Sequence, residues 1–216
     1  MGMYIREPIN GLTHLLGAVL SIFGLVALTI KASTTTDSIL ALTAVIIFGV
    51  SMILLYSASA TYHMVIARDH VIAFLRRMDH SMIFVLIAGT YTPFCLISLN
   101  GTTTGWVLFS VINGLAIMGV IFKLIWFHAP RWLSTALYII MGWIVVFFSP
   151  SLAPAIGTAG MVFLVLGGVF YTIGGIIYWL KPKFLEFKHM GFHEVFHIFI
   201  MFGTLFHFIC IYGYVL

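Results

Sequence analysis

The sequence predicts an all-α integral membrane protein, a single bundle of seven transmembrane helices. Of its 216 residues, 62% are hydrophobic and only 7% are charged. The apolar residues gather in runs of about 20, the length that a helix needs to span a bilayer. Soluble domains carry roughly 25% charged residues, so most of this surface must face lipid. Because the loops between the runs are short, residues 1–216 are expected to form one domain.

Short polar or helix-breaking connections separate the seven apolar runs. Residues 33–37 form a polar turn that supplies a helix N-cap. A basic stretch from Arg68 to Arg77 precedes the third run, either as a connection or as a short helix at the interface. Pro150 and Pro154 bracket an uncharged turn. The predicted spans are residues 12–31, 39–65, 79–99, 105–127, 132–149, 158–180 and 192–215.

The basic residues predict how this bundle is oriented. With seven spans, nine of the ten lysines and arginines fall on the side of the N-terminus, and only Lys31 falls on the other. Positive charge in short loops favours the cytoplasm, so the N-terminus is expected inside and the C-terminus outside. We interpret the chain as a multi-pass protein of a bacterial plasma membrane. The nine residues are Arg6, Arg68, Arg76, Arg77, Lys123, Arg131, Lys181, Lys183 and Lys188.

Other compositional features narrow the possible partners. Cys95 and Cys210 both lie inside apolar runs, which predicts neither a disulfide framework nor a thiol metal site. Nothing in the sequence is typical of nucleic-acid binding, and no oligomeric state is indicated. The expected partner is membrane lipid, as the surrounding bilayer and as a potential substrate.

Ionisable residues inside the predicted spans gather near the cytoplasmic end. Such residues are costly in a bilayer and are candidates for function. His63 lies near the end of the second span, Asp79 opens the third, and His193 and His197 open the seventh. At a rise of about 1.5 Å per residue, all four lie within roughly 15 Å of the cytoplasmic interface. Three histidines and one aspartate can therefore meet at one depth.

This set of residues predicts a zinc site. His193 and His197 are four residues apart, so on a helix they share one face and can hold one metal ion. Three histidines with an open fourth position are a common catalytic zinc sphere, although copper and iron also accept imidazole. The predicted metal ligands are His63, His193 and His197, with Zn²⁺ as cofactor. The predicted catalytic residue Asp79 would orient the metal's water or an imidazole, or take the water's proton.

Further polar residues could support the site. Ser59, four residues before His63, is the second predicted catalytic residue. Its hydroxyl could hydrogen-bond to the water or the substrate, or to its own helix carbonyl. Glu194 could serve a metal-bound water or face a neighbouring helix. His207 lies about 21 Å beyond His193 along the helix, which predicts a separate polar contact or cavity. Three residues on one face of the first helix could cap helix ends or close the site from below: Glu7, Asn10 and His14.

Together these motifs resemble the hemolysin III family, part of the progestin and adipoQ receptor superfamily of seven-span proteins. The resemblance runs from residue 7 to the final helix. It implies an intracellular N-terminus and zinc held by the three histidines, with Asp79 contacting the metal through water and Ser59 nearby. It also links the chain to membrane hydrolases such as alkaline ceramidases, which share a Ser, an Asp and three His. The motifs are Glu7-x-x-Asn10-x-x-x-His14, Ser59-x-x-x-His63 with Asp79, and His193-x-x-x-His197.

Several functions are compatible with these residues. The first is hydrolysis of a lipid amide or ester, such as a ceramide-like molecule, by zinc-activated water. The alternatives are a cytolytic pore, as the family name indicates, and a non-catalytic sensor or regulator of membrane state with structural zinc. A proton-coupled transporter using His14, Asp79 and His207 is a further option. An intramembrane zinc protease is disfavoured, because no acidic residue follows Glu194 to complete its ligand set.

Overall fold

The computed structural model describes residues 5–126, 128–187 and 190–216, and in these ranges it contains helices and no β-strand. Lys188 and the last residue of the predicted span 105–127 lie outside the described residues. The long helices are α1 (Pro8–Thr35), α2 (Ile39–Met64), α3 (Asp69–Pro93), α4 (Thr103–Ile125), α5 (Arg131–Trp143), α6 (Val145–Leu180) and α7 (Phe192–Cys210). Shorter helical segments are η1 (Phe94–Ser98), η2 (Lys183–Leu185) and η3 (Ile211–Val215).

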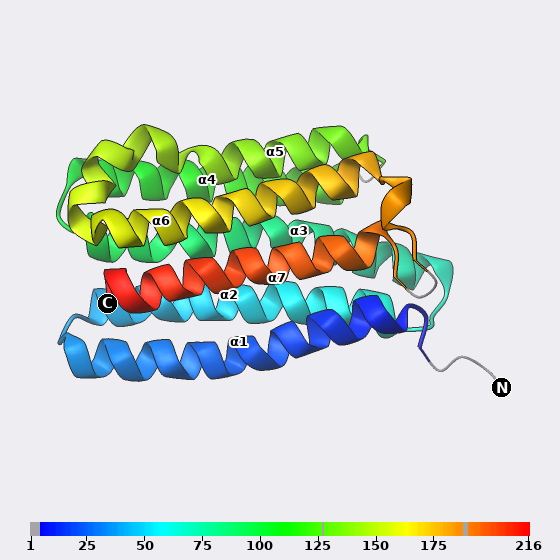
Figure 1. Ribbon diagram of the computed structural model, residues 1–216, viewed down its shortest axis with the longest axis horizontal. Helices are drawn as coiled ribbons and strands as arrows, with labels where there is room; N and C mark the ends of the chain where they lie inside the picture. Colours follow the sequence, from blue (N-terminus) through cyan, green and yellow to red (C-terminus); the bar gives the residue numbers. More distant parts are fainter. Residues whose placement is uncertain (1–4, 127, 188–189) are drawn as a thin grey trace.

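Within the described ranges, six helical stretches are long and apolar enough to cross a membrane. Five of them match predicted spans, whereas Arg131–Leu180 runs for 50 residues and contains two predicted spans. The predicted count of seven is therefore not reproduced by length and hydropathy alone. The start of α1 and the C-terminus lie at opposite ends of the bundle (Figure 1).

The stretch Arg131–Leu180 folds back on itself near Gly157. Gly157 has φ 68° and ψ 174°, a backbone conformation that favours glycine. Beyond it the chain runs back along α5 (Figure 1), so that Trp143 Nε1 donates to Thr172 Oγ1 at 2.8 Å. The turn predicted around Pro150 and Pro154 is helical up to this glycine, which corrects the prediction. Proline fixes φ near its helical value, and the glycine alone leaves that region.

Helix α3 is the centre of the bundle. It begins at Asp69 and not at the predicted residue 79, so the basic stretch up to Arg77 forms its first turns. Asp69 in the first turn suits the positive end of the helix dipole. In the most apolar window of the Asp69–Ser98 span, 67% of residues are buried, against 28% in α1. Asp79 therefore lies inside a buried helix and does not open one.

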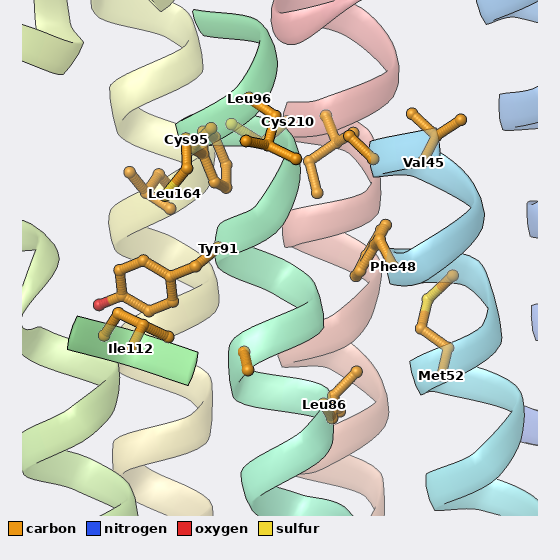
Figure 2. Packing of buried hydrophobic residues seen from close by; sticks show 14 of the residues in the cluster. Val45, Phe48, Met52, Leu86, Tyr91, Cys95, Leu96, Ile112, Leu164 and Cys210 are labelled. Carbon is orange, nitrogen blue, oxygen red and sulfur yellow. The ribbon is translucent and has the colours of Figure 1, made fainter. Parts of the chain in front are cut away.

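Side chains from several helices pack around α3. Figure 2 shows Phe48 and Met52 of α2, Leu86 of α3 and Leu164 of α6 among them. Cys95 and Cys210 are free and buried, as the sequence predicts. The apolar interior thus joins helices that are far apart in sequence.

A group of three hydroxyls ties α2, α6 and α7 together inside this apolar interior. Tyr56 of α2 and Tyr171 of α6 place their hydroxyls 2.6 and 2.7 Å from Thr204 Oγ1. The Thr204 hydroxyl donates to the Ile200 carbonyl at 3.1 Å, so it is free to accept from both tyrosines. Each of these buried hydroxyl groups therefore has a hydrogen-bond partner.

The outer surface of the bundle is apolar. Along α1, the side chains of Leu16, Leu20 and Phe23 are 53%, 54% and 67% exposed. They follow one another at helical spacing, so they form a continuous apolar face. A lipid environment accounts for such a face, because in water it would be an exposed hydrophobic patch.

Candidate metal centre

The three predicted ligands meet at the end of the bundle where α1 begins. His63 comes from the last turn of α2, and His193 and His197 come from the first turns of α7. One potential ligand atom from each lies within 4.8 Å of the others. Figure 1 shows why: the end of α2 and the start of α7 lie beside the start of α1. Helices distant in sequence therefore deliver three imidazoles to one place.

One pair of these nitrogens has the spacing of two ligands on the same metal ion. His63 Nε2 lies 3.4 Å from His193 Nε2. Tetrahedral zinc with Zn–N bonds of about 2.0–2.1 Å places neighbouring nitrogens about 3.3–3.4 Å apart. The ring planes of His63 and His197 lie at 75°, and those of His193 and His197 at 55°. The three rings approach from different directions, as ligands around one ion must.

Glu7 holds the outer nitrogen of His63. Its Oε2 atom lies 2.6 Å from His63 Nδ1, which assigns the proton of the imidazole to Nδ1 and leaves Nε2 free as a ligand. The backbone secures this contact, because Glu7 N donates to the His63 carbonyl at 2.9 Å. The Arg6 guanidinium lies 3.4 Å from Glu7 Oε1. The hydrogen bond from His63, helped by nearby positive charge, lowers the pKa of Glu7 below its ordinary value of 4.5.

Helix α1 also contacts His197. Thr13 Oγ1 lies 3.4 Å from His197 Nδ1 and donates to the Asn10 carbonyl at 3.0 Å. His14 stacks on the His197 ring, with centroids 3.6 Å apart and planes at 9°. Neither ring nitrogen of His14 has a hydrogen-bond partner. Thr13 was not among the predicted site residues, although its position three residues after Asn10 places it on the polar face of α1.

Glu194 faces α1, which is one of the two alternatives predicted for this residue. Its Oε1 accepts a hydrogen bond from Asn10 Nδ2 at 2.7 Å, and its Oε2 accepts from Gly191 N at 2.7 Å. The second contact caps the start of α7. Asn10 Nδ2 also lies 3.3 Å from Glu7 Oε2. Asn10 therefore links the acid beside His63 to the acid that caps α7.

A cavity of about 360 Å³ extends from the histidines through the interior. Ser59, Asp79, His193 and His197 line one part of it, and much of its remaining wall is apolar. Asp79 is buried and does not belong to the three-histidine group. The Ser59 hydroxyl is buried and makes no hydrogen bond. Both predicted catalytic residues therefore face the cavity beside two candidate ligands.

His207 lines the same cavity at another level. Its Nε2 atom lies 3.1 Å from the Leu164 carbonyl, and it is not part of the three-histidine group. The prediction of a separate polar contact is confirmed.

Comparison with known proteins places this arrangement in a family. A family model described as "Haemolysin-III related" matches residues 3–208. The chain belongs to this family. It is 39% identical over 220 residues to "Hemolysin-3" of Bacillus cereus, a match that covers 100% of this chain and 95% of that protein. It is also 39% identical over 212 residues to "Hemolysin-3 homolog" of Bacillus subtilis (strain 168), covering 97% and 95%.

The family resemblance seen in the sequence is thus confirmed. The apolar helices and the haemolysin-III relatives together identify the chain as a membrane protein.

Proposed function

We propose that this haemolysin-III related protein hydrolyses a lipid amide or ester, as a ceramidase does, with zinc bound by His63, His193 and His197. The observation that carries the proposal is the 3.4 Å approach of His63 Nε2 to His193 Nε2, with Glu7 holding the opposite nitrogen of His63. Bound zinc supplies a Lewis acid and lowers the pKa of a water molecule to about 7. The donor set fits the ion, because three neutral imidazoles leave its fourth position open.

The other cavity residues have separate roles in this proposal. Asp79 orients the attacking water or receives its proton, because its carboxyl lies inside the cavity beside the histidines. Ser59 has a hydroxyl without a regular partner, and it donates to the carbonyl oxygen of the substrate. The apolar part of the cavity accommodates an acyl chain and keeps bulk water away from the reacting bond.

We further propose seven membrane crossings with the N-terminus in the cytoplasm of a bacterial cell. At about 1.5 Å per residue, a straight helix with the length of Arg131–Leu180 would reach roughly 75 Å, more than twice the roughly 30 Å bilayer core. The reversal near Gly157 turns this stretch into two crossings. With seven crossings, most basic residues lie at the end where α1 begins, and this end faces the cytoplasm.

Two alternative functions do not involve hydrolysis. The name of the Bacillus cereus relative, "Hemolysin-3", refers to lysis, and a pore is the corresponding function. A regulator of membrane state would keep the zinc only for stability. Hydrolysis is favoured because Asp79 and Ser59 line a cavity shared with two candidate ligands.

Metal content and lipid turnover of the purified protein test these functions. We expect one zinc per chain in the wild type and in His70→Ala, a control at an exposed histidine. Zinc should be lost in His63→Ala and His197→Ala. Asp79→Asn should keep zinc and lose the release of fatty acid from a panel of ceramides and phospholipids.

Each outcome separates the proposals. Zinc unchanged in both histidine variants would contradict the metal site. Zinc present without fatty acid release from any lipid would leave a structural metal and exclude this hydrolase. Lysis of target cells that persists in His63→Ala would assign lysis to a pore that is independent of the metal.

A further inference from the structure

Two cations in the cavity wall have no acidic partner. Lys123 of α4 is only 4% exposed, and its ammonium group donates to the neutral hydroxyl of Ser134. Arg131, at the start of α5, has a buried guanidinium nitrogen, Nη1, without a hydrogen-bond partner. Within the described ranges, neither Lys123 nor Arg131 forms an ion pair with a carboxylate. Burying a charge without a counter-charge is costly, so the position of these side chains needs an explanation.

A position near the membrane surface does not explain why the Lys123 side chain is buried. A lysine near a helix end normally extends to the interface and keeps its ammonium group in water. Lys123 instead points inward and lines the 360 Å³ cavity together with Arg131. Asp79 lines the same cavity, but among the described residues no ion pair joins its carboxyl to Lys123 or Arg131.

The cavity-facing side of α5 offers further donors. Arg131, Ser134 and Thr135 are spaced by three and four residues, so they share one face, and all three line the cavity. Thr135 is 3% exposed, and its hydroxyl has no partner. The start of α5 adds the positive end of a 13-residue helix. An ammonium, a guanidinium, a hydroxyl and a helix terminus thus face one space, which is the donor set that an anion requires.

We propose that Lys123 and Arg131 bind the anionic headgroup of a lipid whose acyl chain occupies the apolar part of this cavity. The headgroup is a carboxylate or a phosphate, since both accept hydrogen bonds from an ammonium and a guanidinium group. The site lies next to the metal centre. Arg131 Cζ is 5.6 Å from the centroid of the Tyr178 ring, and this centroid is 5.7 Å from that of the His193 ring. This inference goes beyond the proposed hydrolysis, because it requires neither a metal nor turnover.

Binding of four probes to the full chain in uncharged detergent tests this site. The probes are palmitate, hexadecyl phosphate, hexadecanol and inorganic phosphate, and the readout is the dissociation constant from calorimetric titration. Palmitate, hexadecyl phosphate or both should bind at least about tenfold more tightly than hexadecanol and inorganic phosphate, because charge and chain both contribute. The tighter of the two anionic probes identifies the headgroup chemistry.

Substitutions then assign the binding to the two cations. Lys123→Met and Arg131→Met should each weaken the binding of the anionic probe at least about tenfold. Arg131→Lys retains the charge and should lose clearly less than Arg131→Met. The matched control is Lys183→Met, at an exposed lysine, which should change binding by less than about twofold. The unfolding midpoint of each variant shows whether it is still folded. If Lys123→Met is unfolded, the comparison of Arg131→Met with Arg131→Lys decides the test.

Several results would overturn the proposal. Hexadecanol binding as tightly as the anionic probes would show that charge plays no part. Inorganic phosphate binding as tightly as hexadecyl phosphate would show that the apolar cavity plays none. No loss of binding in either methionine variant would exclude the two cations from the site. The wild type treated with a zinc chelator should bind the anionic probe as tightly as the untreated wild type, so failure of the zinc proposal would leave this result unchanged.

Discussion

Replacing Glu7 by glutamine tests whether the first residues of the chain tune the metal centre. The carboxylate accepts a 2.6 Å hydrogen bond from His63 Nδ1, and glutamine keeps an oxygen there but removes the charge. A carboxylate in this position fixes the ring and makes its other nitrogen a stronger ligand. Zinc affinity should therefore fall in Glu7→Gln, although all three ligands remain.

The size of the loss follows from two opposing features of this contact. Outer partners of metal-bound histidines typically contribute 10- to 100-fold in affinity. The short, charge-assisted bond favours the upper part of that range, and the His63 side chain is only 2% exposed. The Glu7 side chain, however, is 40% exposed, so water screens its charge and favours the lower part. We expect a loss of about 10- to 30-fold, which equals about 1.4–2 kcal/mol.

Competition against a chromophoric zinc chelator in detergent at neutral pH measures this loss. Glu186→Gln is the matched control, because it makes the same chemical change at an exposed acid, and its affinity should stay within about twofold of the wild type. A zinc affinity in Glu7→Gln equal to that of the control would refute the reasoning. The Glu7–His63 contact would then be only a helix-packing contact.

Two further predictions concern the packing that holds the site in place. A Cβ atom at Gly119 would lie 2.4 Å from the buried Phe84 ring, whereas one at Gly114 on the same helix would meet nothing within 4 Å. In an SDS unfolding assay, Gly119→Ala should lower the free energy of unfolding by about 1–3 kcal/mol, whereas Gly114→Ala should not lower it. Equal effects of the two substitutions would contradict the close approach of Gly119 to the Phe84 ring. Thr204→Val leaves two buried tyrosine hydroxyls without their acceptor and should cost about 1–3 kcal/mol in the same assay. The control is Thr43→Val, at an exposed threonine whose hydroxyl donates to its own helix. If Thr43→Val lowers the free energy of unfolding as much as Thr204→Val does, the two tyrosines find other partners.

The sequence was sufficient to predict which histidines meet, because depth in a membrane is a one-dimensional quantity. His63, His193 and His197 each lie a known number of residues from a charged loop, and the helical rise converts that number into depth. Rotation about the helix axis is not determined in this way. The contacts of Glu194 and Thr13 with α1 depend on which faces of α1 and α7 meet, and only the packed bundle shows this.

Helix limits were predicted less well where charge and proline interrupt an apolar run. The stretch Arg68–Arg77 was predicted to be a connection or a separate short helix, because its charges end the apolar pattern. In the structure α3 begins at Asp69 and continues through this stretch. Pro150 and Pro154 appeared to mark a turn, yet both lie in a helical segment that changes direction near Gly157. A hydropathy pattern records which residues lipid accepts, whereas backbone hydrogen bonds decide where a helix ends.

The count of basic residues on each side of the membrane did not predict that two of them line the cavity. Lys123 and Arg131 support the predicted orientation by their position in the sequence, and a residue in that position is expected to sit in water. Their side chains instead line a cavity, where one cation is nearly fully buried and the other has an unpartnered nitrogen. Orientation requires only that a positive charge stay on one side of the membrane, and it sets no condition on where the side chain points. A residue that supports a predicted orientation can therefore also bind a ligand, and the cost of burying its charge is the reason for proposing an anion beside it.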